Sequence, residues 1–296
     1  MSLKKRTDLA LEAHELCREA GPGDLSALPG VRSCQRTRGH CGITEVEVLD
    51  QQGEQRLQKP PGRYITLELP EGHVRQEEIF QDCVCALAQE LRSLLPRREG
   101  PVLVAGLGNR SMTADAIGPL TLEHLLVTRH LMEELPSSEF RSVCAASPGV
   151  LGITGVETAE FLQGLLLPLQ PAALVVIDAL AARKMQRVCS TVQLGSSGII
   201  PGSGVGNHRQ PLNEDTLHLP VLAVGVPTVV DAATLIADSL ESAGFTEKEL
   251  PFPENCFVTP RDIDAKVRCL AKLLGYGISL ALQPNLEFSQ LAALLS

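Results

Sequence analysis

Residues 101–108 read PVLVAGLG, and this stretch decides the fold class. An unbroken apolar run that leads into a glycine turn is typical of a strand buried on both faces of a parallel sheet. Further strands are expected at 141–150, 172–182, 190–194, 220–230 and 256–260. Segments with helical periodicity alternate with them, at 115–132, 155–169, 231–244 and 261–282. This alternation predicts an α/β fold with a mostly parallel sheet.

The preceding part of the chain has a different pattern. Helices are expected at 6–19 and 75–96, and strands at 41–50 and 62–70 pair as a hairpin. We therefore expect a single domain over 1–296, with N-terminal helix and hairpin elements in 1–98 and the α/β core in 99–296.

Composition excludes several classes of function. The 296 residues are 44% hydrophobic but only 3% aromatic, with no Trp, so the core is aliphatic and no platform for stacking bases exists. A formal charge of −9 with only short basic groups argues against direct nucleic-acid binding. No apolar run is long enough to span a membrane.

The nine cysteines are odd in number and contain no CxxC pair, and no secretory signal precedes the chain. This pattern indicates reduced thiols in the cytoplasm, several of them in the core. Cys34, His40 and Cys41 are close enough in sequence to be part of a metal cluster. They lack a fourth ligand and the usual spacing, so a structural role is favoured and no metal or other cofactor is expected.

Ligands of parallel α/β sheets bind beyond the carboxyl ends of the strands. Asp115, Asp178 and Asp231 are expected at these ends, after the first, third and fifth core strands. The turn at 106–110 is not a dinucleotide fingerprint, because Ser111 replaces the third glycine or alanine and the next strand ends without an acid. No GKS or GKT marks a phosphate-binding loop.

Each of these aspartates has a structural interpretation, as a helix N-cap or a turn residue. Two acids that meet at one sheet edge have a further capability. Their pKa values separate, so that one activates a water as base while the other remains protonated as acid. Such a pair hydrolyses amides without a metal, and no GxSxG or HExxH motif supports another hydrolase mechanism.

A glycine-rich loop at 194–210, LGSSGIIPGSGVGNHRQ, interrupts the alternation of strands and helices. Ordered loops of this length are often functional.

Several of these stretches together resemble the germination proteases of spore-forming bacteria, endopeptidases that degrade small acid-soluble spore proteins. The matching segments are RTDLALEAHE, VLVAGLGNRSMTADAIGP, PGVLGITGVETAE, VVIDALAARKMQRVCSTVQL, GIIPGSGVGN, GVPTVVDAATL and FVTPRDID, in family order from residue 6 to about 283.

The resemblance implies a three-layer α/β/α fold related to hydrogenase maturation proteases. It implies a homotetramer in the cytoplasm of the spore core, made as a zymogen that is trimmed at its N-terminus. It also implies an atypical aspartic endopeptidase that needs no metal, with Asp115 and Asp178 as catalytic residues. Two departures stand out: Ala114 replaces the family's proline, and only five residues precede RTDLALEA.

We expect the two aspartates to share a proton and a water. Backbone amides of two glycine turns would bind the oxyanion and the substrate. The residues concerned are Gly106, Gly108, Asn109, Arg110, Gly202, Gly204, Gly206 and Asn207. Asn109 and Arg110 either orient the substrate or only shape the turn. Glu157 and Asp231 are candidate supporting acids.

Two alternatives remain open. One is a metallopeptidase of the same fold, in which His124 or His208 joins Asp115 or Glu157 as ligands. The other is a binding module without catalytic activity.

Overall fold

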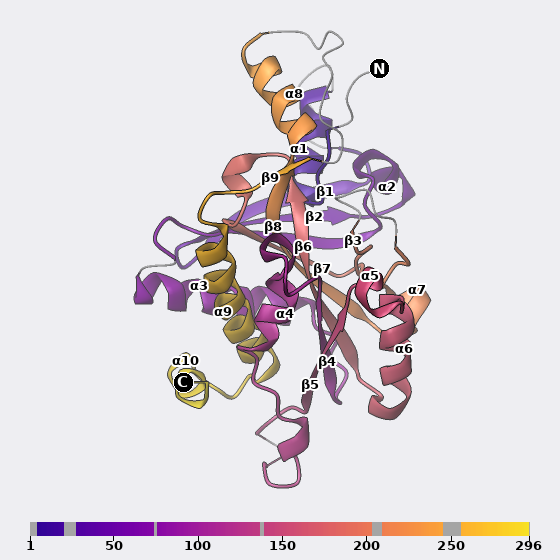
Figure 1. Ribbon diagram of the computed structural model, residues 1–296, viewed down its shortest axis with the longest axis vertical. Coiled ribbons are helices and arrows are strands. Elements are labelled where there is room, and N and C mark those ends of the chain that lie inside the picture. Colours follow the sequence, from indigo (N-terminus) through magenta and orange to yellow (C-terminus); the bar gives the residue numbers. More distant parts are fainter. Residues whose placement is uncertain are drawn as a thin grey trace.

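A nine-stranded sheet organises the computed structural model of the chain (Figure 1). The structure describes residues 5–20, 28–73, 76–136, 139–202, 209–244 and 256–295. Within these ranges the strand order is β1-β2-β3-β7-β8-β6-β4-β5, and β9 pairs with β8 off this path.

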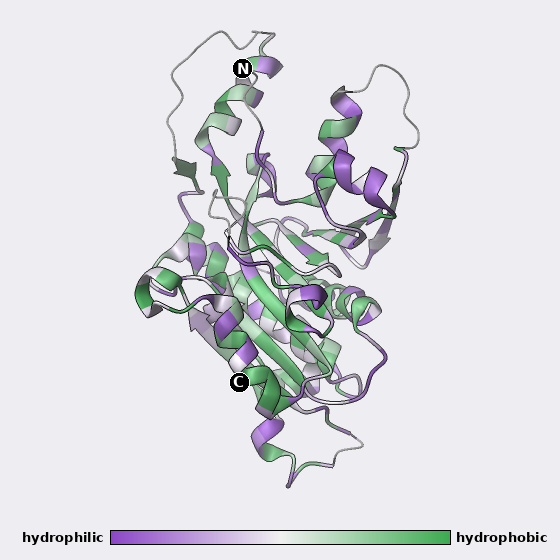
Figure 2. Ribbon diagram, turned by 90° about the vertical axis from the view of Figure 1, so that its right-hand side faces the viewer, coloured by the Kyte–Doolittle hydropathy of each residue, from purple (hydrophilic) through white to green (hydrophobic). Residues whose placement is uncertain are grey.

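The centre of the sheet is parallel. It consists of β8 (Val221–Asp231), β6 (Ala173–Ala182), β4 (Val102–Leu107) and β5 (Val143–Gly149). Every residue of β4 is buried, which explains the unbroken apolar run there. Figure 2 shows the apolar character of the central strands in green. The expected α/β class is confirmed.

Antiparallel strands extend this centre on one side. β7 (Thr191–Gly195) pairs with β8, and then follow β3 (Gly62–Glu68), β2 (Cys41–Val48) and β1 (Val31–Arg38). The predicted pairing of 41–50 with 62–70 is therefore confirmed, and strands from both predicted parts of the chain share one sheet. The short β9 (Phe257–Val258) pairs with the end of β8.

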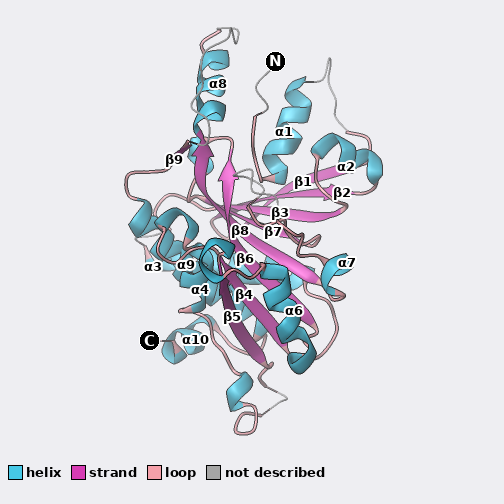
Figure 3. Cartoon of the chain, turned by 45° about the vertical axis from the view of Figure 1, so that its right-hand side comes forward, coloured by secondary structure: helices cyan, strands magenta, loops and turns pink. Residues whose placement is uncertain are grey.

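Helices cover both faces of the sheet, as Figure 3 shows. α3 (Glu77–Leu94), α4 (Ile117–Leu122) and α9 (Ile263–Leu282) lie on one face, and α6 (Thr158–Leu169) and α7 (Glu214–Leu217) on the other. The expected three layers are present. The remaining helices are α1 (Ala10–Ala20), α2 (Gln51–Leu57), α5 (Leu151–Thr154), α8 (Ala232–Ser242) and α10 (Phe288–Leu294). Among the described helices, none is long and apolar enough to cross a membrane.

The predicted helix at 115–132 is wrong. α4 ends at Leu122, and only a short 3-10 turn, η2 (Arg129–Leu131), follows it. The backbone amides of Leu126 and Thr128 donate to Ser279 Oγ at 2.9 Å and to Val143 O at 3.1 Å instead of to helical carbonyls. Tertiary hydrogen bonds from α9 and β5 thus replace the helix that the periodicity suggested.

α4 lies directly on the sheet because two glycines remove the side chains between them. A Cβ on Gly118 would lie 2.2 Å from Leu107 O and 2.8 Å from Ile177 O. A Cβ on Gly106 would lie 2.4 Å from Gly118 O. The backbone of α4 therefore contacts the backbone of β4 and β6 without a spacer, and the segment just before α4 is held close to the sheet.

We predict that Gly118→Ala lowers the free energy of unfolding by about 2–4 kcal/mol, because the methyl group has backbone on several sides and no side chain that can yield. Gly164→Ala is the matched control, since Gly164 lies on the exposed side of α6 and an added methyl group there would have no atom within 4 Å. That variant should be as stable as the parent chain or up to about 1 kcal/mol more stable. Denaturant unfolding measures both, and a Gly118→Ala variant as stable as Gly164→Ala would contradict the packing described.

Candidate active site

Asp115 lies in a 3-10 turn, η1 (Thr113–Asp115), between β4 and α4. Its Oδ2 atom accepts a hydrogen bond of 2.8 Å from Asn109 N. Thr228 of β8 fixes the turn by donating from Oγ1 to Ala114 O at 2.6 Å. At the other end of the turn, Thr113 Oγ1 donates to Asp264 Oδ1 at 2.7 Å. Asp115 is therefore held by its own loop and by a neighbouring strand.

Asp178 lies inside β6, and the prediction that it follows the end of the strand is wrong. The ladder with β8 continues past Asp178↔Gly225 to Ala182↔Val230, because the eleven residues of β8 supply partners that far. The Asp178 side chain is only 6% exposed. Its Oδ1 atom accepts a hydrogen bond of 3.0 Å from Ala179 N.

Both aspartates have raised pKa values. Burial raises the pKa of Asp178 well above its usual range, and the charge of Asp115 raises it further. Burial also raises the pKa of Asp115, while the hydrogen bond from Asn109 opposes this shift. The structure thus places Asp178 in the electrostatic field of Asp115, beside the carboxyl end of β4, and the pKa of Asp178 is raised the more strongly.

The glycines of the first turn contact their own chain. Gly108 has φ +105°, and a Cβ there would lie 2.0 Å from Asp115 O. Gly106 packs against Gly118 as described above. Asn109 gives its amide to Asp115, and Arg110 pairs through Nη2 with Glu123 Oε1 at 2.5 Å on the exposed surface.

The second predicted turn is described only in part. Gly202 has φ +72°, a conformation that favours glycine. Gly204, Gly206, Asn207 and His208 lie outside the described residues.

The two candidate supporting acids occupy helix starts. Glu157 precedes α6, and its Oε1 atom lies 3.4 Å from Arg209 Nη1. Asp231 is the N-cap of α8 and accepts from Thr234 N at 2.9 Å. The structural interpretation of Asp231 as a helix cap is confirmed.

The residues considered as metal ligands lie in environments that differ from a metal site. Cys34 is exposed whereas Cys41 is fully buried, and His40 Nδ1 lies 2.6 Å from Asp82 Oδ2. Within the described ranges, no three His, Cys, Asp or Glu side chains are grouped so that they could hold a metal ion. Burial lowers the pKa of His124, which stands at the end of α4.

Sequence reasoning missed two residues of the site. Asp8 forms a pair of 2.9 Å hydrogen bonds with β6, from its amide to Ala181 O and from Ala181 N to its Oδ2 atom. Its charge adds to the raised pKa of Asp178. Thr228 is the other, and its hydroxyl within the apolar run of β8 was the available signal.

A buried acid beside a half-buried one can exchange protons with a water, and comparison with known proteins gives the class of protein. A family model described as "Germination protease" matches residues 10–243. The chain is therefore a protease, and hence a hydrolase. It belongs to the germination protease family.

Curated relatives cover almost the whole chain. A germination protease of Clostridium acetobutylicum is 41% identical over 97% of this chain and 97% of its own length. That of Clostridium tetani is 40% identical over 98% of this chain and 99% of its own length. The relative from Bacillus cereus is 34% identical over 95% of this chain and 94% of its own length.

One solved structure, the [NiFe] hydrogenase maturation protease HycI from Thermococcus kodakarensis KOD1, aligns with a TM-score of 0.34. The alignment has 16% sequence identity and covers 64% of this chain and 98% of that chain.

We predict that Asp178→Asn stabilises the fold at neutral pH by about 1 kcal/mol. The folded chain holds the Asp178 proton more tightly than the unfolded chain, so the free energy of unfolding falls as pH rises through the raised pKa, and the neutral amide removes this loss. The advantage should vanish below the unfolded pKa of roughly 3.9. Denaturant unfolding at several pH values measures the difference.

The matched control is Asp238→Asn. Although burial raises the pKa of Asp238, hydrogen bonds from Arg183 and Lys5 lower it below its usual range. This substitution should destabilise the fold at neutral pH by about 1 kcal/mol. Equal effects of the two substitutions would contradict the environment described for Asp178.

Proposed function

We propose that Asp115 and Asp178 are the catalytic pair of an endopeptidase that degrades small acid-soluble spore proteins during germination. The observation that carries this proposal is the placement of the two acids: Asp178 is buried beside the carboxyl end of β4, and the charge of Asp115 raises the pKa of Asp178. Membership of the germination protease family and the matching IDALAAR and TADAIGP stretches support it.

The different environments of the two acids assign their roles. Asp178 keeps its proton to higher pH, so it is the acid. Asp115 accepts the Asn109 amide, which favours its carboxylate, so it is the base. Asp115 takes a proton from a water whose oxygen attacks the scissile carbonyl. Asp178 gives its proton to the carbonyl oxygen. As the tetrahedral intermediate collapses, Asp115 gives its proton to the departing amine and Asp178 takes one back from a hydroxyl of the intermediate, which restores the starting state of the pair.

Backbone amides near the pair complete the proposed site. Because the Asn109 amide is directed at Asp115, it positions the base rather than the oxyanion. Oxyanion and substrate binding then fall to the remaining members of the two glycine turns, around Arg110 and in the loop that begins at Gly202. Asp231 supports the site by capping α8, and Glu157 does so through its ion pair with Arg209 at the start of α6.

The remaining proposals concern the state of the enzyme. We propose that it is made as a zymogen, assembles as a homotetramer and acts in the cytoplasm of the spore core. These proposals rest on the resemblance to the family.

We predict that Asp115→Asn and Asp178→Asn each lower kcat/KM by at least about a thousandfold, because either change removes one of the two proton-transfer groups. Asp264→Asn is the matched control, since this exposed acid bonds to Thr113 of the same turn and should retain activity within about threefold. The assay is cleavage of a purified small acid-soluble spore protein, with circular dichroism as the check of folding.

Full activity in either folded aspartate variant would refute the proposal. Exhaustive dialysis against EDTA should leave the parent activity unchanged. Loss of activity that returns on addition of a divalent metal would favour the metallopeptidase alternative. Binding of the substrate without turnover by the parent chain would favour the binding module.

The pH dependence of kcat/KM follows from the two raised pKa values. Activity should rise as Asp115 loses its proton and fall as Asp178 loses its own. Since both pKa values are raised, the maximum should lie above the usual carboxylate range near pH 4. Rates measured from about pH 4 to about pH 9 test this, and a profile without a descending limb would exclude Asp178 as the acid.

A further inference from the structure

Two buried thiols that are not part of the candidate active site lie in contact with each other. Cys41 is the first residue of β2 and Cys83 lies in α3, and both side chains are 0% exposed. Their Sγ atoms are 3.4 Å apart, and both cysteines are free. In the described part of the chain, this is the only contact of this kind between two of the nine cysteines.

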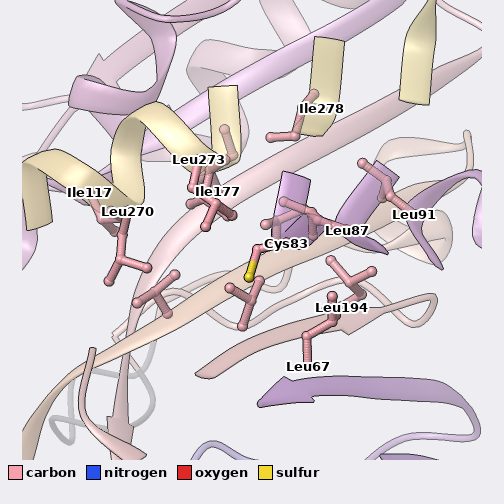
Figure 4. Close-up of a cluster of buried hydrophobic side chains, with 14 of the residues drawn as sticks. Leu67, Cys83, Leu87, Leu91, Ile117, Ile177, Leu194, Leu270, Leu273 and Ile278 are labelled. Carbon is pink, nitrogen blue, oxygen red and sulfur yellow. The ribbon is translucent and has the colours of Figure 1, made fainter. Parts of the chain in front are cut away.

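The pair joins two layers of the fold. Cys83 points from α3 into the apolar cluster beside Leu87, as Figure 4 shows. Cys41 belongs to the same cluster from the side of the sheet. A bond between them would tie α3 to the antiparallel part of the sheet.

A surface turn lies next to the buried pair. Strands β1 and β2 are joined by the two residues Gly39 and His40, and Arg38 pairs with Cys41 across the turn. His40 contacts Asp82, the residue before Cys83, and these side chains are 50% and 39% exposed. Cys41 and Cys83 are thus each one residue away from an exposed contact at the sheet edge. Local opening of a hairpin end costs far less than global unfolding, and such an opening at 38–41 would give small solutes access to the thiols.

The two sulfurs are chemically unequal. The hydrogen bond between them lowers the pKa of Cys41, although burial and the charge of Asp82 oppose this. The same hydrogen bond and burial raise the pKa of Cys83. This asymmetry favours Cys41 as the thiolate that reacts first, with Cys83 as its resolving partner.

We propose that Cys41 and Cys83 are a redox modification site, at which a hydroperoxide converts the buried thiol pair into a disulfide that joins β2 to α3. The Cys41 thiolate attacks one peroxide oxygen and breaks the O–O bond, which gives a sulfenic acid and releases an alcohol or water. The Cys83 sulfur then attacks the Cys41 sulfur, and its proton leaves with the displaced hydroxide as water. The two sulfurs lose two electrons and the peroxide gains them.

The disulfide would cross-link the unfolded chain between residues 41 and 83 and so stabilise the fold. It involves neither β4 nor β6, and neither cysteine takes part in the proposed catalysis. The proposal is therefore independent of the proposed function.

The experiment treats the reduced full chain with hydrogen peroxide, alkylates the remaining thiols after denaturation and maps the peptides. The number of alkylated cysteines should fall by two, with one linked peptide pair that contains Cys41 and Cys83. The melting temperature should rise by roughly 5 °C or more and return on reduction with dithiothreitol. Cys83→Ala should lose both effects, whereas Cys34→Ala, which removes an exposed thiol, should retain them.

The mapping of the parent chain decides the outcome even if Cys83→Ala folds poorly. The proposal is overturned if Cys41 and Cys83 remain alkylatable while the exposed Cys34 and Cys256 are oxidised. A link from Cys83 to Cys269, whose charge acts on Cys83 from α9, would also overturn it.

Discussion

The close contact between Gly106 and Gly118 is the constraint on which the candidate site depends. With no side chains at these positions, the backbone of α4 rests on the backbone of β4 and β6. The turn that carries Asp115 immediately precedes α4, so this contact fixes how far Asp115 stands from the sheet. A spacer of one methyl group would move the turn away from the strand that carries Asp178. The glycines that suggested close approach of a ligand thus serve first to bring two parts of the chain together.

Two buried acids near the end of β6, Glu12 and Asp178, differ in the number of hydrogen-bond donors around them. Glu12 of α1 is 0% exposed, and its carboxylate accepts from the amides of Arg183 and Lys184 and from Arg187. Asp178 lies on β6, shortly before Arg183 in the chain. It accepts one hydrogen bond that the structure records, from Ala179 N. Burial of a charge is tolerated where donors surround it and is costly where they do not. Glu12 therefore binds α1 to the end of β6. Asp178 has a raised pKa instead, which is a property that the proposed proton transfer needs.

The sequence was sufficient for the α/β class, because long apolar runs such as that of β4 have few alternatives to a doubly covered strand. It also predicted Asp115 and Asp178 as the catalytic residues, from the resemblance and the expected strand ends; this choice stays a prediction, and β6 continues past Asp178. It failed where partners distant in sequence decide the local structure. The amides of Leu126 and Thr128 donate to Ser279 and Val143 instead of continuing α4. The length of β8 carried β6 past Asp178. The contribution of Asp8 required the N-terminal segment to lie along β6, which no local pattern indicates.

The backbones of the two aspartates differ in their freedom to move, because Asp178 lies inside a strand and Asp115 lies on a short turn. Asp178 pairs with Gly225 of β8, and its neighbour Ile177 pairs with Gly106 of β4, so the backbone of Asp178 has little freedom to move. Asp115 sits on a three-residue turn that two threonine hydroxyls hold in place. Under the proposed function, any change in the separation of the two carboxyl groups on substrate binding must therefore come from the turn. The hydrogen bonds of Thr113 and Thr228 then set how far Asp115 can move.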